Sequence, residues 1–306
     1  MVKLQHVPLF RTSDALASLA GLKSVRSLLL NDTAVTDAGL EAVGRVATLQ
    51  NLDLRGCGVT SSGVSALTGL SNLKALRFSG KSGKTNVDDD AMEAIAKLTK
   101  LKVLALDFLF AGEAEDLAKL EGLGDLEELY AGGTLLDDAS LAVIATFQKL
   151  KKLRAAANQV TNAGLAEIAK MSQLEELDLS ENIKISDDGL VHLAGMTQLK
   201  KLNLWRVQIT DEGLKHLAGL TNLEWLNVDN SGVADAGLAH LSGMTKLAFL
   251  HLGSTAVTDA GLVYLEPLTA LKELKVTRTG VTEAGVEKLK EKLPNTEIQL
   301  KYIAGE

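Results

Sequence analysis

Residues 199–222 read LKKLNLWRVQITDEGLKHLAGLTN, and residues 223–246 read LEWLNVDNSGVADAGLAHLSGMTK. If the first residue of each stretch is offset 0, apolar residues recur in both at offsets 0, 3, 5, 10, 15, 18 and 21. Leu202 and Leu204, at offsets 3 and 5, alternate with polar residues, as is typical of a strand with one buried face. Offsets 15, 18 and 21 have the spacing of an apolar stripe along a helix. Each unit is therefore predicted to form a strand, a turn, a helix and a second turn.

The same 24-residue period extends along the chain. The units begin at Val25, Leu49, Leu73, Leu101, Leu126, Leu150, Leu174, Leu199, Leu223, Leu247 and Leu271. One unit cannot bury its apolar side alone, whereas stacked units share a continuous core. We therefore predict an α/β solenoid of about eleven full repeats.

The repeat leaves no room for a second domain, so we expect residues 1–306 to form a single one. Residues 25–294 contain the repeats, and residues 295–306 contain a terminal strand and tail. Residues 1–24 form a degenerate unit whose apolar offsets are occupied by Leu4, Leu16, Leu19 and Leu22. A monomer is expected, with end-to-end association wherever a terminal sheet edge is uncovered.

The composition disfavours several classes of function. The net charge is −7 and no cluster of Lys or Arg forms a basic stripe, so nucleic acid is not expected as a partner. No apolar run approaches the length of a membrane span, so no membrane association is expected. Met1–Phe10 lacks the apolar stretch of a signal peptide, and the single cysteine, Cys57, cannot form an internal disulfide. A cytoplasmic protein is therefore expected.

The units share the pattern L-x-x-L-x-L-x-x-(T/N/C)-x-(V/I)-T-D-x-G-L-x-x-L, with Thr-Asp at residues 36–37, 210–211 and 258–259. This pattern resembles the leucine-rich repeats of the cysteine-containing subfamily, found in F-box receptors of ubiquitin ligases, and the T-D-A-G-L repeats of many bacterial proteins. The resemblance implies a curved solenoid, a horseshoe with a parallel β-sheet on its concave side and helices on its convex side, which is used to bind proteins. No F-box-like helical segment precedes the repeats, and Thr stands where those receptors often have Cys. Both differences favour the bacterial or stand-alone kind.

Two polar positions of the unit are predicted to satisfy backbone groups. The Thr-Asp pair is placed to cap the following helix by accepting hydrogen bonds from its free N–H groups. Small polar side chains at offset 8 can bond the backbone of the adjacent loop. These residues are Thr33, Cys57, Thr134, Asn158, Ser231, Thr255 and Thr279. We therefore interpret Cys57 as structural rather than reactive.

One irregular stretch, Ser79–Thr85, contains both Gly-Lys-Ser and Gly-Lys-Thr. A phosphate-binding loop needs four residues between its first glycine and the Gly-Lys pair, with a strand before it and a helix after it. The spacing in Ser79–Thr85 is too short. We interpret the stretch as a flexible basic loop at the rim of the solenoid, available to a partner.

Other clusters are better explained by the repeat than by chemistry. Asp88, Asp89 and Asp90 occupy the slots of the Thr-Asp pair, which favours a role at the start of a helix. Three histidines recur at one helix position, as the local consensus requires: His192, His216 and His240. The sequence predicts no catalytic residues, no metal and no cofactor.

Strand residues at offsets 2, 4 and 6 are predicted to face the concave side. Aromatic and arginine side chains dominate many interfaces, and large exposed aromatics are unfavourable unless they are used. Including offset 7, the candidate partner-binding residues are Trp205, Arg206, Trp225, Asn227, Asp229, Phe249, His251 and Arg278. A secondary patch comprises Arg77, Phe108, Tyr130 and Arg154. In the competing interpretation, the aromatics stack as cross-strand pairs and only stabilise the sheet.

The leading hypothesis is a non-enzymatic module that holds a protein or peptide on its concave face. Three alternatives stay open. The resemblance to F-box receptors allows a substrate-recognition subunit of a ubiquitin-ligase-like or effector complex. The regularity of the repeats allows a structural or designed solenoid without a ligand. Aromatic residues beside Asn and Asp also suit a carbohydrate.

Overall fold

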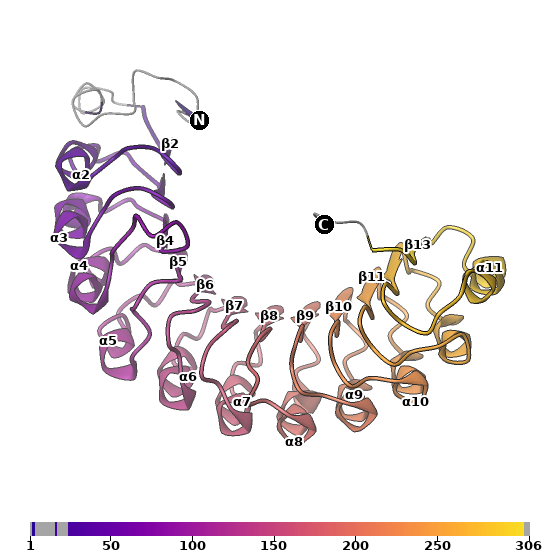
Figure 1. Cartoon of the computed structure of the whole chain (residues 1–306). Coiled ribbons are helices and arrows are strands. Elements are labelled where there is room, and N and C mark those ends of the chain that lie inside the picture. The colour runs from indigo at the N-terminus through magenta and orange to yellow at the C-terminus, as the bar shows by residue number, and fades with distance from the viewer. Residues whose placement is uncertain (1, 4–15, 17–23, 303–306) are drawn as a thin grey trace. The chain divides into compact units, whose positions relative to one another are not determined.

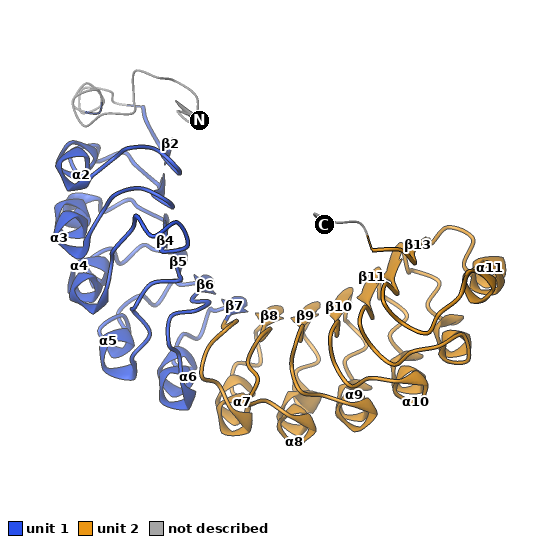
Figure 2. Cartoon of the chain, viewed as in Figure 1, with its two compact units in different colours: residues 1–154 blue, residues 155–306 orange. Residues whose placement is uncertain are grey.

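The structure is a computed structural model, and it describes residues 2–3, 16 and 24–302. The chain divides into two compact units, Met1–Arg154 and Ala155–Glu306 (Figure 2). In both units short strands and short helices alternate along the chain (Figure 1). Of the leucines predicted to belong to the first repeat, Leu16 is buried, and the other three lie outside the described residues.

In the first unit a parallel sheet forms one side and the helices form the other, as Figure 1 shows. Its strands are β1 (Val2–Lys3), β2 (Ser27–Leu29), β3 (Asn51–Asp53), β4 (Ala75–Ser79), β5 (Val103–Asp107), β6 (Glu128–Tyr130) and β7 (Lys152–Arg154). Its helices are α2 (Asp37–Val43), α3 (Ser61–Val64), η3 (Ser65–Gly69), η4 (Asp89–Ala91), α4 (Met92–Ala96), α5 (Ala114–Ala118) and α6 (Asp138–Ile144). Each strand pairs in parallel with the next one along the chain.

The second unit repeats this arrangement. Its strands are β8 (Glu176–Asp178), β9 (Lys201–Asn203), β10 (Trp225–Asn227), β11 (Phe249–His251), β12 (Glu273–Lys275) and β13 (Glu297–Gln299). Its helices are α7 (Asn162–Ile168), α8 (Asp187–Leu190), η5 (Val191–Gly195), α9 (Asp211–Leu217), α10 (Asp235–Leu238), η6 (Ala239–Leu241), η7 (Gly261–Leu265) and α11 (Glu283–Lys292). Pairing is parallel from β8 to β13, with partners one repeat apart. The predicted solenoid of strands and helices is confirmed.

The leucines of the repeat form the core of each unit. Around β9, Leu202 and Leu204 are fully buried. Asn203 and Trp205, which alternate with them, are partly exposed. This alternation confirms the predicted phase of the strand. It places offsets 2, 4 and 6 on the side of the sheet that faces away from the core, which we call the sheet face. Among the described residues, no helix has both the length and the apolar character needed to cross a bilayer.

The residue at offset 7 turns the chain away from the sheet. Its φ lies between 50° and 60° in eight repeats, at Asp32, Phe108, Ala157, Glu181, Arg206, Asn230, Ser254 and Arg278. This left-handed conformation is unfavourable for residues that carry a side chain. Because the unfavourable φ recurs at the same step of these eight repeats, we attribute it to the repeat. It places the offset-7 side chains at the rim of the sheet face, just beyond the strands.

The Thr-Asp pair connects successive repeats rather than capping only its own helix. The carboxylate of Asp37 accepts hydrogen bonds from the backbone N–H and the hydroxyl of Thr60 in the next repeat, at 2.8 and 2.7 Å. The prediction that the aspartate caps its own helix is therefore wrong. The threonine caps some helices only: Thr210 accepts from the backbone N–H of Glu212, whereas Thr36 makes no such bond. We call this Asp-to-Thr contact the clamp.

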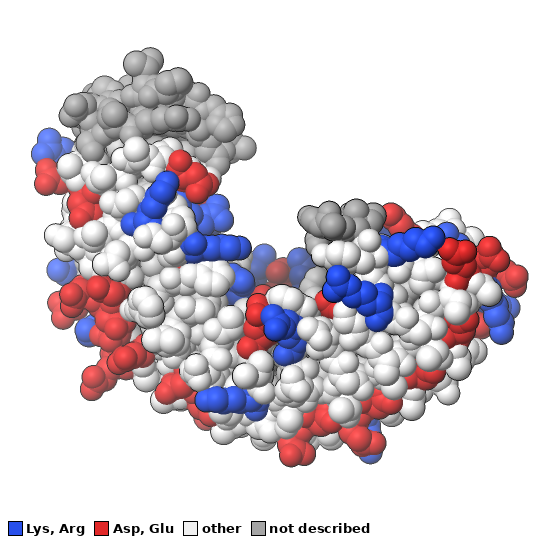
Figure 3. Space-filling model, in the orientation of Figure 1, with Lys and Arg blue, Asp and Glu red and all other residues white. Residues whose placement is uncertain are grey.

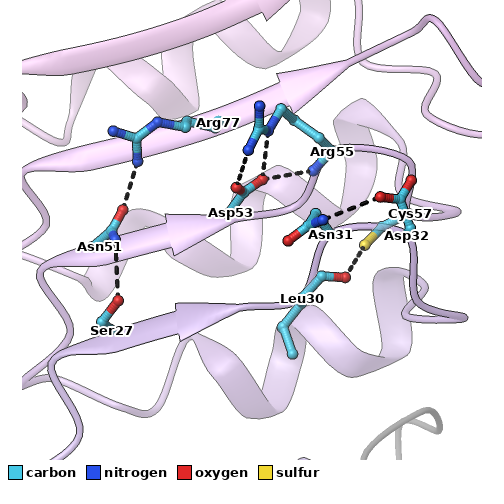
Figure 4. A network of polar contacts seen from close by, with 9 residues as sticks. All are labelled: Ser27, Leu30, Asn31, Asp32, Asn51, Asp53, Arg55, Cys57 and Arg77. Carbon is cyan, nitrogen blue, oxygen red and sulfur yellow. Dashed lines mark hydrogen bonds and ion pairs between the residues drawn. The ribbon is translucent and has the colours of Figure 1, made fainter. Parts of the chain in front are cut away.

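The small polar side chains at offset 8 bond the loop backbone as predicted. The hydroxyls of Thr33 and Thr255 donate to carbonyl oxygens three residues earlier, each at 2.6 Å. The thiol of Cys57 donates to the carbonyl of Leu30 at 3.1 Å (Figure 4). It also lies 3.6 Å from the hydroxyl of Thr33. Burial raises the pKa of the Cys57 thiol, which favours its unreactive form. These contacts support a structural role for this cysteine.

Candidate functional site

Trp225 and Phe249 stack against each other on the sheet face of the second unit. They are register partners on β10 and β11, with ring centroids 4.9 Å apart and planes 4° from parallel. The spacing of neighbouring strands brings two flat rings at the same offset into contact. His251 lies edge-on to Phe249 at 6.4 Å. All three residues are partly exposed, so the stack stabilises the sheet and still presents aromatic surface.

Trp205 lies on the same face but in another row. It follows the end of β9, where its backbone N–H donates to the side chain of Asn203 at 3.2 Å. The guanidinium of Arg206 stands 5.4 Å from its ring and also pairs with Glu181 at 3.3 Å. The two tryptophans therefore have different ring partners, Arg206 for Trp205 and Phe249 for Trp225.

A pocket of about 390 Å³ opens beside Trp205. Of the candidate residues, it brings together Trp205, Asn227, Asp229, His251 and Arg278. Five further lining residues were not singled out from the sequence: Asn230, Ser254, Thr277, Gln299 and Tyr302. Lys275, at offset 4, belongs to the rows that the repeat predicts on this face, and it also lines the pocket. Tyr302 follows the last strand, where no repeat pattern gives its position.

Some of the polar side chains that line the pocket already contact other lining residues. The side-chain oxygen of Asn227 accepts from the backbone N–H of Asp229 at 2.9 Å. The guanidinium of Arg278 stacks over the ring of Tyr302 at 4.0 Å, within the range of a cation–π contact. Burial lowers the pKa of the His251 imidazole, and the carboxylate of Asp229 opposes this only in part. The ring is therefore mainly neutral at pH 7, with one donor and one acceptor nitrogen.

The secondary patch in the first unit is only partly brought together. Arg154 lies 5.7 Å from the ring of Phe108 and forms an ion pair with Asp107 at 3.0 Å. The Tyr130 hydroxyl donates to Glu128 on its own strand at 2.8 Å. Exposed apolar side chains that sequence reasoning missed lie near this patch in the chain, with Phe110 and Leu135 exposed by 70% and 49%.

The fourth residue of that patch, Arg77, belongs to a polar network on β2 to β4 (Figure 4). It donates to Asn51 at 2.6 Å, and Asn51 in turn donates to the hydroxyl of Ser27. On the same face Arg55 forms two hydrogen bonds with the carboxylate of Asp53, at 2.9 and 2.6 Å. These contacts hold the side chains within the sheet, so Arg77 is less available to a partner than its charge suggests.

The basic loop Ser79–Thr85 does not have the geometry of a phosphate-binding loop. Ser79 is still part of β4, and the hydroxyl of Thr85 donates to the carbonyl of Cys57 at 2.9 Å. The next helix begins only at Asp89. Lys81 extends over the ring of Phe108 at 5.8 Å, which places the loop beside the secondary patch.

In the view of Figure 3, groups of acidic side chains lie over the helices. Asp88 accepts from the backbone N–H of Asp90 at the start of η4, as expected for helix-start chemistry. Burial, followed by the nearby carboxylates of Asp116 and Glu113, raises the pKa of Asp89 to about 6. Within the described parts of the chain, no group of three or more His, Cys, Asp or Glu residues could hold a metal ion.

Known proteins share this repeat. The sequence matches the family described as Leucine Rich repeat over residues 47–67 and 170–194. The structure is similar to that of an internalin from Listeria monocytogenes, with 21% identity and a TM-score of 0.64 over 96% of this chain and 90% of the internalin. The protein is a leucine-rich-repeat solenoid.

This leucine-rich-repeat protein is also similar to an internalin C2 from the same species, with 25% identity and a TM-score of 0.51 over 61% of this chain and 84% of that one. A TDR receptor matches 98% of this chain with 53% of its own length, at 17% identity and a TM-score of 0.64. A Trypanosoma equiperdum protein with the provisional name adenylate cyclase regulatory protein is 29% identical over 186 residues. These cover 60% of this chain and 28% of that protein, so the chain spans less than a third of its length. Leucine-rich-repeat proteins generally mediate protein–protein interaction.

Proposed function

We propose that the protein is a non-enzymatic binding module that holds a protein or peptide partner on the sheet face of its second unit. The observation that carries this proposal is the pocket beside Trp205, because five of the eight candidate residues line it. The stacked rings of Trp225 and Phe249 lie on the same strands as two of the pocket residues, Asn227 and His251. The proposed surface therefore joins an aromatic platform to a polar pocket.

The chemistry of this surface supports a protein partner. A partner that covers the partly exposed rings of Trp225 and Phe249 removes their remaining apolar surface from water. Arg206 and Arg278 stand at the rim, where guanidinium groups can bond carboxylates or carbonyls of a bound chain. Such combinations of aromatic anchors and arginine dominate many protein interfaces. A reducing, cytoplasmic setting belongs to the same proposal and rests on the lone Cys57.

A carbohydrate ligand is the second candidate. The pocket combines the rings of Trp205 and Tyr302 with the polar side chains of Asn227 and Asp229. Flat apolar rings beside such groups also suit a sugar, which has an apolar face and several hydroxyls. The proposals predict different ligands for one pocket, so a binding experiment separates them.

The proposed function is tested with three forms of the full chain, the wild type, the double variant Trp225→Ala/Phe249→Ala, and Tyr264→Ala as a control. Tyr264 is 41% exposed on η7, on the helix side of the same unit. A partner recovered from native lysate with the wild type is purified, and its Kd is measured for each form. We expect the double variant to weaken binding by about 30-fold or more and the control to leave it unchanged. Equal affinity for all three forms, with similar Tm values, overturns the proposal.

A further inference from the structure

The sheet face of the second unit has a gap in one row of side chains. At offset 6, the row just beyond the strands contains Trp205, Asp229, Gly253 and Thr277. Gly253 is buried and contributes no side chain between two polar neighbours. Its φ lies outside the left-handed region, so the backbone there does not require a glycine.

Three polar atoms surround this gap. A Cβ atom on Gly253 would lie 2.8 Å from Nε2 of His251, 2.9 Å from Oδ1 of Asp229 and 3.0 Å from Oγ1 of Thr277. All three of these side chains line the pocket beside Trp205. Over the described ranges, none of these three side-chain atoms forms a hydrogen bond with another protein group. Their hydrogen-bonding capacity is therefore open to a group that enters from the pocket, just above the glycine.

The charges around the gap favour a neutral guest. The carboxylate of Asp229 repels an anion, and the nearby cations Lys275 and Arg278 repel another cation. A hydroxyl group fits this setting, because it can donate to Asp229 and accept from the Thr277 hydroxyl or the imidazole of His251. It completes the hydrogen bonds without placing an unpaired charge in the pocket.

The walls of the pocket favour a hydroxyl carried on a flat ring. Trp205 and Tyr302 both line it, and its volume of about 390 Å³ accommodates one aromatic side chain. We propose that this pocket receives a tyrosine side chain of the protein partner, with the phenol oxygen above Gly253 and between Asp229 and Thr277. This inference rests on the proposed function, because it names what the partner inserts.

The probe for this inference is N-acetyl-L-tyrosinamide, titrated into the full chain. Binding is followed through the indole N–H resonance of Trp205, assigned with Trp205→Phe. Trp225 is the only other tryptophan of the chain and provides a comparison in the same spectra. We expect saturable movement of the Trp205 resonance. N-acetyl-L-phenylalaninamide, which lacks only the hydroxyl, is expected to bind about 10-fold more weakly.

Two variants test the geometry of the gap. Gly253→Ala places a methyl group among the three polar atoms and is expected to weaken tyrosinamide binding by about 10-fold or more. Gly243→Ala is the matched control, since its Cβ would have no atom within 4 Å. Thr277→Val keeps the shape of the side chain, removes the hydroxyl and is expected to weaken binding as well. Circular dichroism and Tm show that each variant is folded.

Three outcomes overturn the inference: no binding of tyrosinamide, equal binding of the two amides, or unchanged binding by both Gly253→Ala and Thr277→Val. Saturable binding of methyl α-D-glucopyranoside in place of tyrosinamide also overturns it and assigns the pocket to a sugar. The proposed function can fail separately. If a protein partner needs Trp225 and Phe249 but tyrosinamide does not bind, only the inference fails. If tyrosinamide binds and the double variant retains the protein partner, the proposed function fails.

Discussion

The carboxylate of Asp187 accepts hydrogen bonds from both the backbone N–H and the hydroxyl of Thr210 in the following repeat, at 2.7 and 2.6 Å. The same pair of contacts joins Asp235 to Thr258 and Asp259 to Thr282. Hydrogen bonds to an ionised acceptor are stronger than those between neutral groups. The Thr-Asp motif therefore holds neighbouring repeats together.

Removal of the clamp should destabilise the stack. Asp187→Ala leaves Thr210 without its acceptor, and we expect a loss of about 1–2 kcal/mol in the free energy of unfolding. The matched control is Asp188→Ala, an exposed carboxylate one residue later in α8, for which we expect a change of a few tenths of a kcal/mol. Urea unfolding followed by circular dichroism gives both values. Equal losses in the two variants exclude a special role for the clamp.

The glycine of the repeat makes room for the clamp. A Cβ atom on Gly213 would lie 2.3 Å from the carboxylate oxygen of Asp187. An alanine inside a helix normally stabilises it by about 1 kcal/mol relative to glycine. We nevertheless expect Gly213→Ala to destabilise the protein, because the methyl group displaces that carboxylate.

The sign of the effect should change when the clamp is absent. In the Asp187→Ala background, Gly213→Ala is expected to be neutral or stabilising, since the methyl group then meets no carboxylate. A double-mutant cycle measured by urea unfolding isolates this coupling. Additive losses contradict the assignment of Gly213 to the clamp.

Asp89 should make stability depend on pH in the opposite direction to most carboxylates. Burial, Asp116 and Glu113 raise its pKa to about 6, from an ordinary value of 3.8. The folded state therefore binds the proton more tightly than the unfolded state. The resulting stability is present below the ordinary pKa and is lost as the pH rises through 6. We expect Asp89→Asn to be more stable than the wild type at pH 7 and similar to it near pH 4. Thermal unfolding at both pH values measures this, and a constant difference between the proteins rules it out.

Most of the fold follows from apolar spacing alone. The buried Leu202 and Leu204, on either side of Asn203, fix which side of β9 faces the core, and the same offsets repeat in every unit. The clamp could not be predicted from one unit, because its two partners are 23 residues apart, as in Asp37 and Thr60. Several predicted helices are short 3-10 turns, such as Gly261–Leu265, although that repeat has the same length as the one that contains α9.

The candidate site was predictable where offsets decide position and unpredictable elsewhere. Trp225 and Phe249 share an offset, so parallel pairing brings them into contact. Trp205 has a different offset and therefore lies in the row that contains Gly253. Tyr302 lies beyond the last strand, where no later unit repeats its position. The role of Gly253 is visible only once its neighbours are placed, because a missing side chain leaves no mark in a hydrophobic pattern.

Site-specific photo-cross-linking tests the central claim most directly. The photoreactive residue p-benzoylphenylalanine replaces either Phe249 on the sheet face or Val263, which is 54% exposed on the helix side of the same unit. Each protein is irradiated with the purified partner at equal concentration. The account predicts a cross-linked product from position 249 and none from position 263. A product from position 263 alone, or equal products from both positions, contradicts binding on the sheet face.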